Sequence, residues 1–319
     1  MRILIYGFGN LGKRHMQAAL DMSLSTSVSI HDEFISPNTV RQQVAVFLAA
    51  NGASEKGKRV FVLDRAQVEE SDKFHLVIDA TLAHSRLSRL SKLLLSLSYQ
   101  PDAVLVEKLV VSRLSEGHDI RTFHSSFSAW NIYVHCPRST WPAYRGLNSL
   151  FSQDSLDLQV DLVGTELGSN FIHFVALFDF ILSRRIIPEE CLVVDSAITW
   201  QPSERRHAVS EGYGAITLKF SRHSLKVSAR ECLGGDGATC NVSISSRGET
   251  LFSYSETSGE LRSGGEIREE IAPFLSQSSY LYTEILQGNS SLPTFYQSIV
   301  HHELVFDCFE KSKLSGAVT

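Results

Sequence analysis

The start of the chain constrains the fold more than any other stretch, because a short apolar run leads straight into a glycine-rich turn. Residues 3–6 form the apolar run, and Gly7-Phe8-Gly9-Asn10-Leu11-Gly12 follows with the spacing G-x-G-x-x-G. Residues 13–20 then continue with apolar side chains at helical spacing. A strand, a glycine turn and a helix in this order are the context in which this motif binds a dinucleotide. We therefore predict a cofactor site that includes the whole glycine turn.

Each glycine of this motif has a physical task in such a site. The first glycine makes the tight turn, the second lets the backbone approach a pyrophosphate, and the third lets the helix pack close to the strand. The free N–H groups at the helix N-terminus then favour the anion. Three glycines after a strand also fit a plain turn without a ligand, and this alternative stays open.

The run that follows the glycine motif supplies a second signal. Residues 27–31 alternate polar and apolar side chains as a strand does, and Asp32 and Glu33 stand directly behind it. A carboxylate at this strand end accepts hydrogen bonds from an adenosine ribose and repels a 2′-phosphate. Asp32 therefore favours NAD, with NADP as the alternative cofactor. Asp32 as a solvated loop acid, with Glu33 at the ribose, is the competing interpretation.

The order of the predicted elements indicates two domains. Strand and helix patterns alternate over residues 1–125, which predicts an α/β Rossmann dinucleotide-binding domain with a parallel sheet. Closely spaced strand patterns between residues 192 and 254 predict an α+β domain with a large, mostly antiparallel sheet over residues 126–319. The second domain is expected to bind the substrate and to dimerise, and helical spacing over residues 266–310 predicts terminal helices that pack back on the first domain.

Composition and charge exclude several function classes. The net charge of −5, without a basic block, argues against nucleic-acid binding. No apolar run approaches the roughly 18 residues of a membrane span, and the N-terminus shows no signal-peptide pattern. Five scattered cysteines without a C-x-x-C pair predict reduced thiols in the cytoplasm. The histidines and acids show no metal-ligand spacing, so no metal is predicted.

The glycine motif, Arg14-His15 behind it, and Val106-Glu107-Lys108 after a later strand resemble the glucose–fructose oxidoreductase and inositol dehydrogenase family, Gfo/Idh/MocA. The resemblance implies an NAD(P)-dependent oxidoreductase that moves a hydride between nicotinamide and a hydroxyl or ketone of a sugar. It places Lys108 at the substrate oxygen, although Leu109 stands where the family usually has proline. A surface lysine paired with Glu107 is the alternative. Thr81 and Glu107 are predicted cofactor contacts because they fall at the carboxyl ends of predicted strands, where a parallel sheet binds its ligand, and the resemblance adds Arg14 and His84.

The resemblance also identifies a catalytic histidine, His173, on a helix predicted over residues 170–182. The family has an aspartate four residues earlier on the same helical face, where this chain has Ser169, with Asn170 beside it as a substrate contact. This departure motivates a second hypothesis, a sugar- or cofactor-sensing regulator without turnover. A core histidine is the structural alternative for His173.

The segment between the predicted domains carries an arginine and two aromatic residues, which suit a rigid loop facing a sugar. Arg138 would bind a phosphate or carboxylate of an acidic or nucleotide-linked sugar, and Trp141 and Tyr144 would stack on it. An ordered connector without ligand contacts is equally compatible. A homodimer is predicted because helices are expected to cover only one face of the second sheet, which leaves apolar residues on the other face. These are Ile216, Leu218, Phe220, Val227 and Val242.

Overall fold

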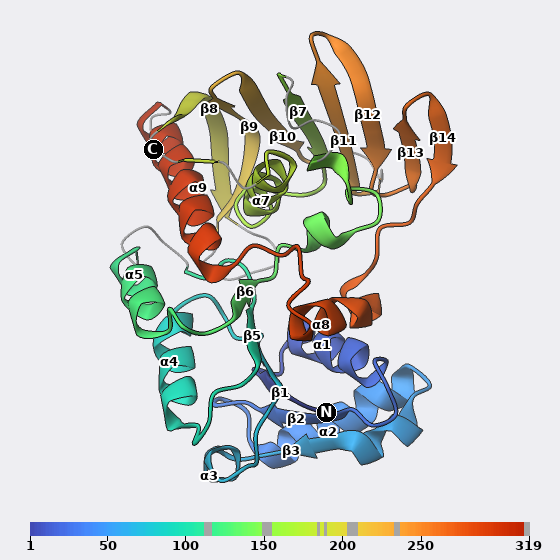
Figure 1. Cartoon of the computed structure of the whole chain (residues 1–319), viewed down its shortest axis with the longest axis vertical. Helices are drawn as coiled ribbons and strands as arrows, with labels where there is room; N and C mark the ends of the chain where they lie inside the picture. Colours follow the sequence, from blue (N-terminus) through green and yellow to red (C-terminus); the bar gives the residue numbers. More distant parts are fainter. Residues whose placement is uncertain are drawn as a thin grey trace. The chain divides into compact units, whose positions relative to one another are not determined.

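The structure is a computed structural model, and it divides into two compact units (Figure 1). It describes all residues except 112–116, 149–154, 184–185, 188–189, 203–209, 233–236 and 316–319. The first unit comprises Met1–His135 and Pro273–Tyr296, and the second comprises Cys136–Ala272 and Gln297–Thr319. The sequence placed the boundary near residue 125. It lies at His135 because residues 132–134 add a last strand to the first sheet.

The first unit is built on a parallel sheet with the strand order β3-β2-β1-β4-β5-β6 (Figure 1). The chain places β2 and β3 on one side of β1, and then β4, β5 and β6 on the other side. Doubly wound sheets bind ligands outside the carboxyl ends of the strands where this order changes sides, which here is between β1 and β4. The predicted α/β fold is therefore confirmed. The strands are β1 (Arg2–Tyr6), β2 (Ser27–His31), β3 (Val60–Val62), β4 (Leu76–Asp79), β5 (Ala103–Val106) and β6 (Ile132–Val134).

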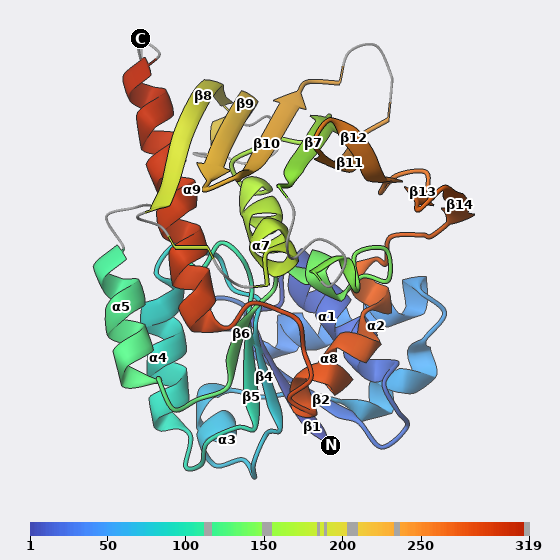
Figure 2. The same cartoon turned by 45° about the horizontal axis from the view of Figure 1, so that its top comes forward.

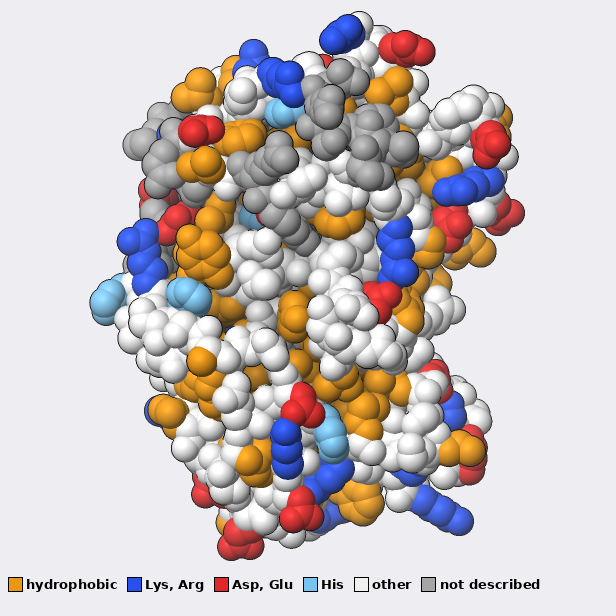
Figure 3. Space-filling model, in the orientation of Figure 1, with side chains coloured by type: hydrophobic (Ala, Val, Ile, Leu, Met, Phe, Trp, Pro, Cys, Tyr) orange, Lys and Arg blue, Asp and Glu red, His pale blue; other side chains and the backbone are white. Residues whose placement is uncertain are grey.

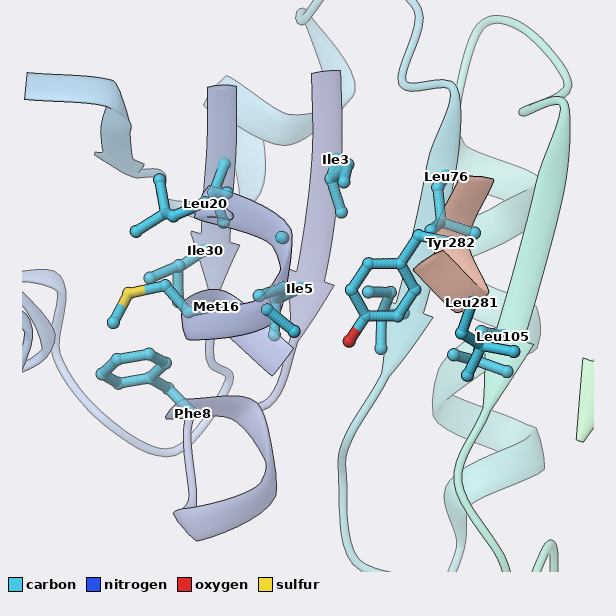
Figure 4. Close-up of a cluster of buried hydrophobic side chains, with 14 of the residues drawn as sticks. Ile3, Ile5, Phe8, Met16, Leu20, Ile30, Leu76, Leu105, Leu281 and Tyr282 are labelled. Atoms are coloured by element: carbon cyan, nitrogen blue, oxygen red, sulfur yellow. The ribbon is translucent and has the colours of Figure 1, made fainter. Parts of the chain in front are cut away.

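The helices of the first unit cover this sheet. They are α1 (Asn10–Leu20), α2 (Pro37–Ala50), α3 (Arg65–Glu69), α4 (Arg86–Ser96), α5 (Gly117–Ser126) and α8 (Ser279–Leu286), with short 3-10 turns at Ser54–Arg59 and Leu275–Gln277. Helix α8 comes from late in the chain and packs beside α1. Figure 4 shows side chains from β1, β2, β4, β5, α1 and α8 meeting in one buried cluster. This packing holds fixed the strand ends that form the candidate site.

The second unit is built on a larger sheet with the order β14-β13-β12-β11-β7-β10-β9-β8. Most pairs are antiparallel as predicted, but β10 runs parallel to β7. Its strands are β7 (Asp157–Val163), β8 (Cys191–Pro202), β9 (Ser210–Phe220), β10 (His223–Arg230), β11 (Thr239–Ser246), β12 (Glu249–Ser255), β13 (Glu260–Ser263) and β14 (Glu266–Glu269). Helical spacing was expected from residue 266 onward, so the strand β14 corrects that prediction.

Two helices pack on this second sheet, and a 3-10 turn (Pro137–Thr140) precedes it. Helix α7 (Phe171–Ile181) contacts β10, and α9 (Phe295–Ser315) packs on β8, where Ser196 Oγ donates to the Cys308 carbonyl (Figure 2). Ten of the eleven residues of α7 are buried, and eight of these ten are apolar. Its burial explains why a broad apolar face could be read from the sequence.

The five apolar residues that motivated the predicted homodimer do not lie on an open face. Strand β7 alternates exposed and buried residues, with Asp157, Gln159 and Asp161 on its exposed side. The apolar residues of the neighbouring strands point to the buried side and pack inside the chain itself. The correction concerns Ile216, Leu218, Phe220, Val227 and Val242, all at most 7% exposed. The homodimer stays a prediction without this support.

No described helix is both long and apolar enough to cross a membrane. Figure 3 shows acidic side chains interspersed among the basic ones, and the described part of the face drawn there carries no continuous basic patch.

Candidate active site

The glycine turn sits at the carboxyl end of β1 and has a backbone conformation that requires glycine. Gly7 has φ of 93°, and a Cβ on it would lie 3.0 Å from the Ala80 carbonyl carbon and the Thr81 nitrogen. The Gly7 N–H donates to the His31 carbonyl at 2.9 Å. The turn is thereby fixed between the ends of β2 and β4.

The N-terminus of α1 is open for an anion. Gly9 is the N-cap residue, and no side chain caps the helix. Gly9, Asn10 and Leu11 are exposed, and a Cβ on Gly9 would meet nothing within 4 Å. The first N–H groups of a helix have no partner within it, so an uncapped, glycine-lined start favours a phosphate. Gly12 has the structural task instead, because a Cβ there would lie 2.2 Å from the Gly7 carbonyl oxygen.

Asp32 contacts the glycine turn and is not a solvated loop acid. Its Oδ2 accepts the Phe8 N–H at 2.7 Å, and its Oδ1 accepts the N–H groups of Phe34 and Ile35 at 2.9 and 3.0 Å. A carboxylate has about four lone-pair sites, so one acceptor position is left for a ligand hydroxyl. Asp32 thus ties the turn to the loop after β2.

A cavity of about 410 Å³ opens at this end of β2. Its lining includes three acids, Asp32, Glu33 and Asp64, together with Arg65 and Lys92. The Arg65 guanidinium is already engaged: Nε donates to Glu69 at 2.6 Å, and Nη2 donates to the Ser96 hydroxyl and the Lys92 carbonyl. A 2′-phosphate in this cavity would therefore face the three acids, and Arg65 would have to give up its present contacts to bind it.

Two further observations test whether these residues fit a dinucleotide. The Thr81 hydroxyl is buried at the end of β4 and has no hydrogen-bond partner among the described residues. Its N–H donates to Asp79 Oδ1 at 2.9 Å, which holds the loop after β4 against the glycine turn. A ligand hydroxyl or amide would satisfy the Thr81 hydroxyl. The open glycine cradle and this unpaired hydroxyl both fit a dinucleotide.

Glu107 was predicted as a cofactor contact, but its carboxylate is used inside the protein. Glu107 Oε1 accepts from His15 Nε2 and from His135 Nδ1, each at 2.8 Å, and His15 Nδ1 accepts from the Tyr282 hydroxyl at 2.6 Å. Burial alone would raise the pKa of Glu107, but the two histidines hold it well below its ordinary value. Burial lowers the pKa of His15. The network is a buried carboxylate held by two imidazole donors.

His15, Glu107 and His135 bring possible metal-ligand atoms together, although their spacing in the sequence did not indicate a metal site. One ligand atom each from His15, Glu107 and His135 lie within 4.8 Å of one another. The 2.8 Å separations from Glu107 Oε1 are those of hydrogen bonds that share a proton. Hydrogen bonding thus accounts for this cluster without an ion.

Lys108 follows Glu107 at the carboxyl end of β5. Its side chain is half-buried, and the peptide bond to Leu109 is cis, a geometry otherwise found almost only before proline. His15 and His135 both contact Glu107 Oε1 in the interior, and the role of Lys108 at the substrate oxygen stays a prediction. Lys108 shares the ligand edge of the sheet with the glycine turn and Thr81.

The arginine and the second aromatic residue of the segment after His135 have partners within the second unit. Arg138 Nε and Nη2 donate to the two Glu256 carboxylate oxygens at 2.7 Å each, and the Tyr144 hydroxyl donates to the same carboxylate. Arg138 also lies over the Phe174 ring at 4.3 Å. The predicted ligand contacts of Arg138 and Tyr144 do not fit this arrangement, because Tyr144 is fully buried and the arginine fork is filled.

His173 lies in the first turns of α7 and is 8% exposed. The start of α7 has a carboxylate nearby although residue 169 is a serine. The Ser169 hydroxyl and N–H both donate to Glu166. The Asn170 side chain donates to the Glu166 carbonyl at 2.9 Å. The carboxylate expected at residue 169 from the resemblance is thus present three residues earlier in the chain, one hydrogen bond from Ser169.

Arg14, His84 and Trp141 were also predicted to contact a ligand. Arg14 donates to Gln17 at 3.2 Å and lies over the Phe47 ring. His84 is exposed, and its carbonyl accepts from Arg89. Trp141 is half-buried and packs on Tyr144, with ring centroids 6.1 Å apart. These positions leave their predicted ligand contacts as predictions.

Sequence reasoning missed the polar residues that organise the ligand edge. Arg86 donates to the carbonyls of Thr81, Glu107 and Leu109, and Glu256 holds the segment that contains Arg138. No local pattern marks either residue. The sequence held only an indirect signal for such partners. An acidic residue that directly follows a buried strand is close to the interior, and a buried charge needs a partner.

The comparisons with known proteins rest on structure alone, since neither a protein-family model nor a curated protein matches the sequence. A Gfo/Idh/MocA family oxidoreductase from Vibrio cholerae is 15% identical, with a TM-score of 0.65 over 99% of each chain. A myo-inositol dehydrogenase from Lactobacillus casei, solved with NAD(H) and myo-inositol, is 11% identical, with a TM-score of 0.63 over 98% of this chain and 94% of that one.

A regulator matches as well as these enzymes do. The transcriptional regulator Gal80p from Kluyveromyces lactis is 11% identical, with a TM-score of 0.69 over 98% of this chain and 90% of that one. Fold does not fix function, and identities this low bear on the fold alone. The chain therefore has the two-domain fold of the Gfo/Idh/MocA oxidoreductases, as its glycine motif and Glu107-Lys108 predict.

Proposed function

We propose that the chain is an oxidoreductase that binds a nicotinamide dinucleotide and acts on a hydroxyl or ketone of a sugar or sugar derivative. The observation that carries the proposal is the ligand edge of the first sheet. The uncapped start of α1, the unpaired Thr81 hydroxyl and Lys108 all belong to this edge. The fold supports the same class, since the Vibrio cholerae protein is an oxidoreductase and the Lactobacillus casei enzyme binds NAD(H).

The charges around β2 favour NAD over NADP. Asp32, Glu33 and Asp64 line the cavity at the strand end, and Arg65 is held by Glu69 and Ser96. A 2′-phosphate would be placed among carboxylates, whereas a ribose hydroxyl would donate to the open acceptor position of Asp32. We therefore expect the dissociation constant for NADPH to exceed that for NADH.

Lys108 and His173 are the groups proposed to act on the substrate. A bound nicotinamide supplies the hydride acceptor or donor. The Lys108 ammonium would orient the substrate oxygen and stabilise negative charge that develops on it. His173 would take or return the hydroxyl proton as a general base or acid. Arg138 no longer argues for an acidic or nucleotide-linked sugar, because Glu256 fills its fork.

A regulator without turnover is the second candidate function. It is favoured by Ser169, which replaces the acid expected beside His173, and by the likeness to Gal80p. Both candidates require cofactor or sugar binding, so binding does not separate them. Turnover does.

The test is a fluorescence titration with NADH and NADPH, followed by absorbance at 340 nm with a panel of free polyols, sugar acids and nucleotide-linked sugars. We expect tighter binding of NADH and an absorbance change with one sugar class. The rate of this change should fall steeply in Lys108→Met while NADH still binds. Lys73→Met is the matched control, because Lys73 is an exposed lysine paired with Asp102. Full turnover by Lys108→Met would remove Lys108 from the chemistry, and no binding of either cofactor would overturn the whole proposal.

A further inference from the structure

The main chain on both sides of Lys108 is held by one buried guanidinium. Arg86, the first residue of α4, is 3% exposed. Its Nη1 donates to the carbonyl oxygens of Glu107 and Leu109, the residues before and after Lys108. Its Nη2 donates to the Thr81 carbonyl at the end of β4. One side chain thus joins the ends of β4 and β5 and encloses the Lys108 backbone.

The residue before Lys108 is fixed on its other groups as well. The Glu107 N–H donates to the Asp79 carbonyl at 3.0 Å, and the Glu107 carboxylate accepts from His15 and His135. Every polar group of Glu107's main chain therefore has a partner. The direction in which the chain enters Lys108 is set by these contacts together with Arg86.

A buried arginine is a costly way to fill space at a helix start. Burial opposes its charge, and the nearest acid, Asp79 Oδ2, lies 3.8 Å from Arg86 Nε. An apolar side chain of similar volume often gives equal or greater stability at such a buried position. What an apolar side chain does not supply is a planar set of donors that reaches three carbonyls at once. The arrangement therefore serves geometry more than stability.

We propose that Arg86 is a positioning residue for Lys108, and this inference rests on the proposed function of Lys108. By holding the carbonyls of Glu107 and Leu109, Arg86 fixes where the Lys108 amine stands at the ligand edge. Displacements of about 1 Å in a reacting group can cost about a hundredfold in rate. Loss of the Arg86 fork is thus expected to lower turnover without an equal loss of cofactor binding.

The neighbouring Arg89 provides a matched control on the same helix. Arg89 also donates to two carbonyls, those of Leu82 and His84, each at 2.9 Å, but both belong to the loop after β4. Arg89→Met removes a cation and two such contacts from α4 without touching the residues beside Lys108. Arg86→Met removes the fork, and Arg86→Lys keeps the charge while losing the planar set of donors.

The experiment measures each variant in three ways: NADH affinity, kcat and KM, and the pH-dependent rate at which the Lys108 amine is reductively methylated, followed by peptide mass spectrometry. For Arg86→Met we expect kcat to fall 10- to 100-fold, NADH affinity to change less than threefold, and the labelling profile of Lys108 to change. Arg86→Lys should be intermediate, and Arg89→Met should leave the labelling profile of Lys108 as in wild type. In a Lys108→Met background, Arg86→Met should cause no further loss of kcat.

Several results would overturn the inference. One is a Lys108 labelling profile in Arg86→Met equal to that of Arg89→Met. Another is an Arg86→Met effect on kcat that persists undiminished in the Lys108→Met background. If Arg86→Met does not fold by circular dichroism, Arg86→Lys carries the same comparison. A wild-type chain that binds NADH but turns over no sugar would remove the proposed function alone, because the labelling arm needs no turnover and still decides the role of Arg86.

Discussion

Two alanine substitutions in the glycine turn separate the ligand site from the fold around it. Gly9 and Gly12 belong to the same motif, but a Cβ on Gly9 would meet nothing within 4 Å, whereas a Cβ on Gly12 would lie 2.2 Å from the Gly7 carbonyl oxygen. Gly9→Ala should therefore fold and fail to bind the cofactor normally. Gly12→Ala should be destabilised whether or not a cofactor is present.

The magnitudes follow from these distances. Gly9 is the N-cap of α1 with φ of −71°, which alanine adopts freely. Alanine is a poorer N-cap than glycine, but it loses less backbone entropy on folding, so we expect the free energy of unfolding to change by less than about 1 kcal/mol. At Gly12 the clash is with backbone, so overpacking should cost about 1–3 kcal/mol or more.

The effect on cofactor affinity is separate from the effect on stability. A methyl group on Gly9 would stand where a pyrophosphate approaches the helix N-terminus, and each displaced hydrogen bond to a charged group is worth about 1.5–3 kcal/mol. Since 1.4 kcal/mol is about tenfold in affinity, Gly9→Ala should raise the NADH dissociation constant at least about tenfold. The assay is NADH fluorescence titration beside urea unfolding of wild type and both variants. An unchanged dissociation constant in a folded Gly9→Ala would refute phosphate binding at this turn.

The other predictions concern the buried polar groups. Burial lowers the pKa of His15, so the unfolded chain binds more protons than the folded one as pH falls below about 6.5, and the free energy of unfolding should decline with it. His15→Asn should flatten this decline between about pH 7.5 and 5.5, with the exposed His118→Asn as control. The depressed pKa of Glu107 adds stability that is present above about pH 4.3 and lost as pH falls further, so in acid titrations Glu107→Gln should unfold with a shallower dependence on pH. Glu256→Ala leaves Arg138 buried without its carboxylate and should cost about 3–5 kcal/mol in urea unfolding, whereas Glu260→Ala at the exposed Arg262 pair should cost at most about 1 kcal/mol.

The parts of the fold that were predictable are those with a period. Alternating strand and helix patterns located β1, β2, β4 and β5 in the parallel sheet, and period-two alternation located β7. The same alternation does not say which side of a strand is covered. Residues such as Ile216 and Val242 could therefore be placed on an open face from sequence, although the chain's own core covers them.

The polar partners of the candidate site have no period. Arg138 reads as a ligand-binding residue because its neighbours are aromatic, yet its partner Glu256 is 118 residues away in the chain. Glu107 likewise meets His15, 92 residues earlier, only because α1 packs on the sheet beside β5. A motif gives the chemical type of a residue, but whether its charge is already used depends on contacts that only the folded chain brings about.

Each of the two departures from the family pattern has a neighbouring residue that contacts the same position. Ser169 replaces the acid expected one helical turn before His173, but its hydroxyl donates to Glu166, so a carboxylate remains one hydrogen bond from that position. Leu109 replaces the expected proline, and the carbonyls on both sides of Lys108 are held by Arg86. In each case the side chain differs while the local arrangement is supplied by another residue of this chain. Neither departure therefore decides between enzyme and regulator, and the absorbance change at 340 nm with a sugar is the measurement that does.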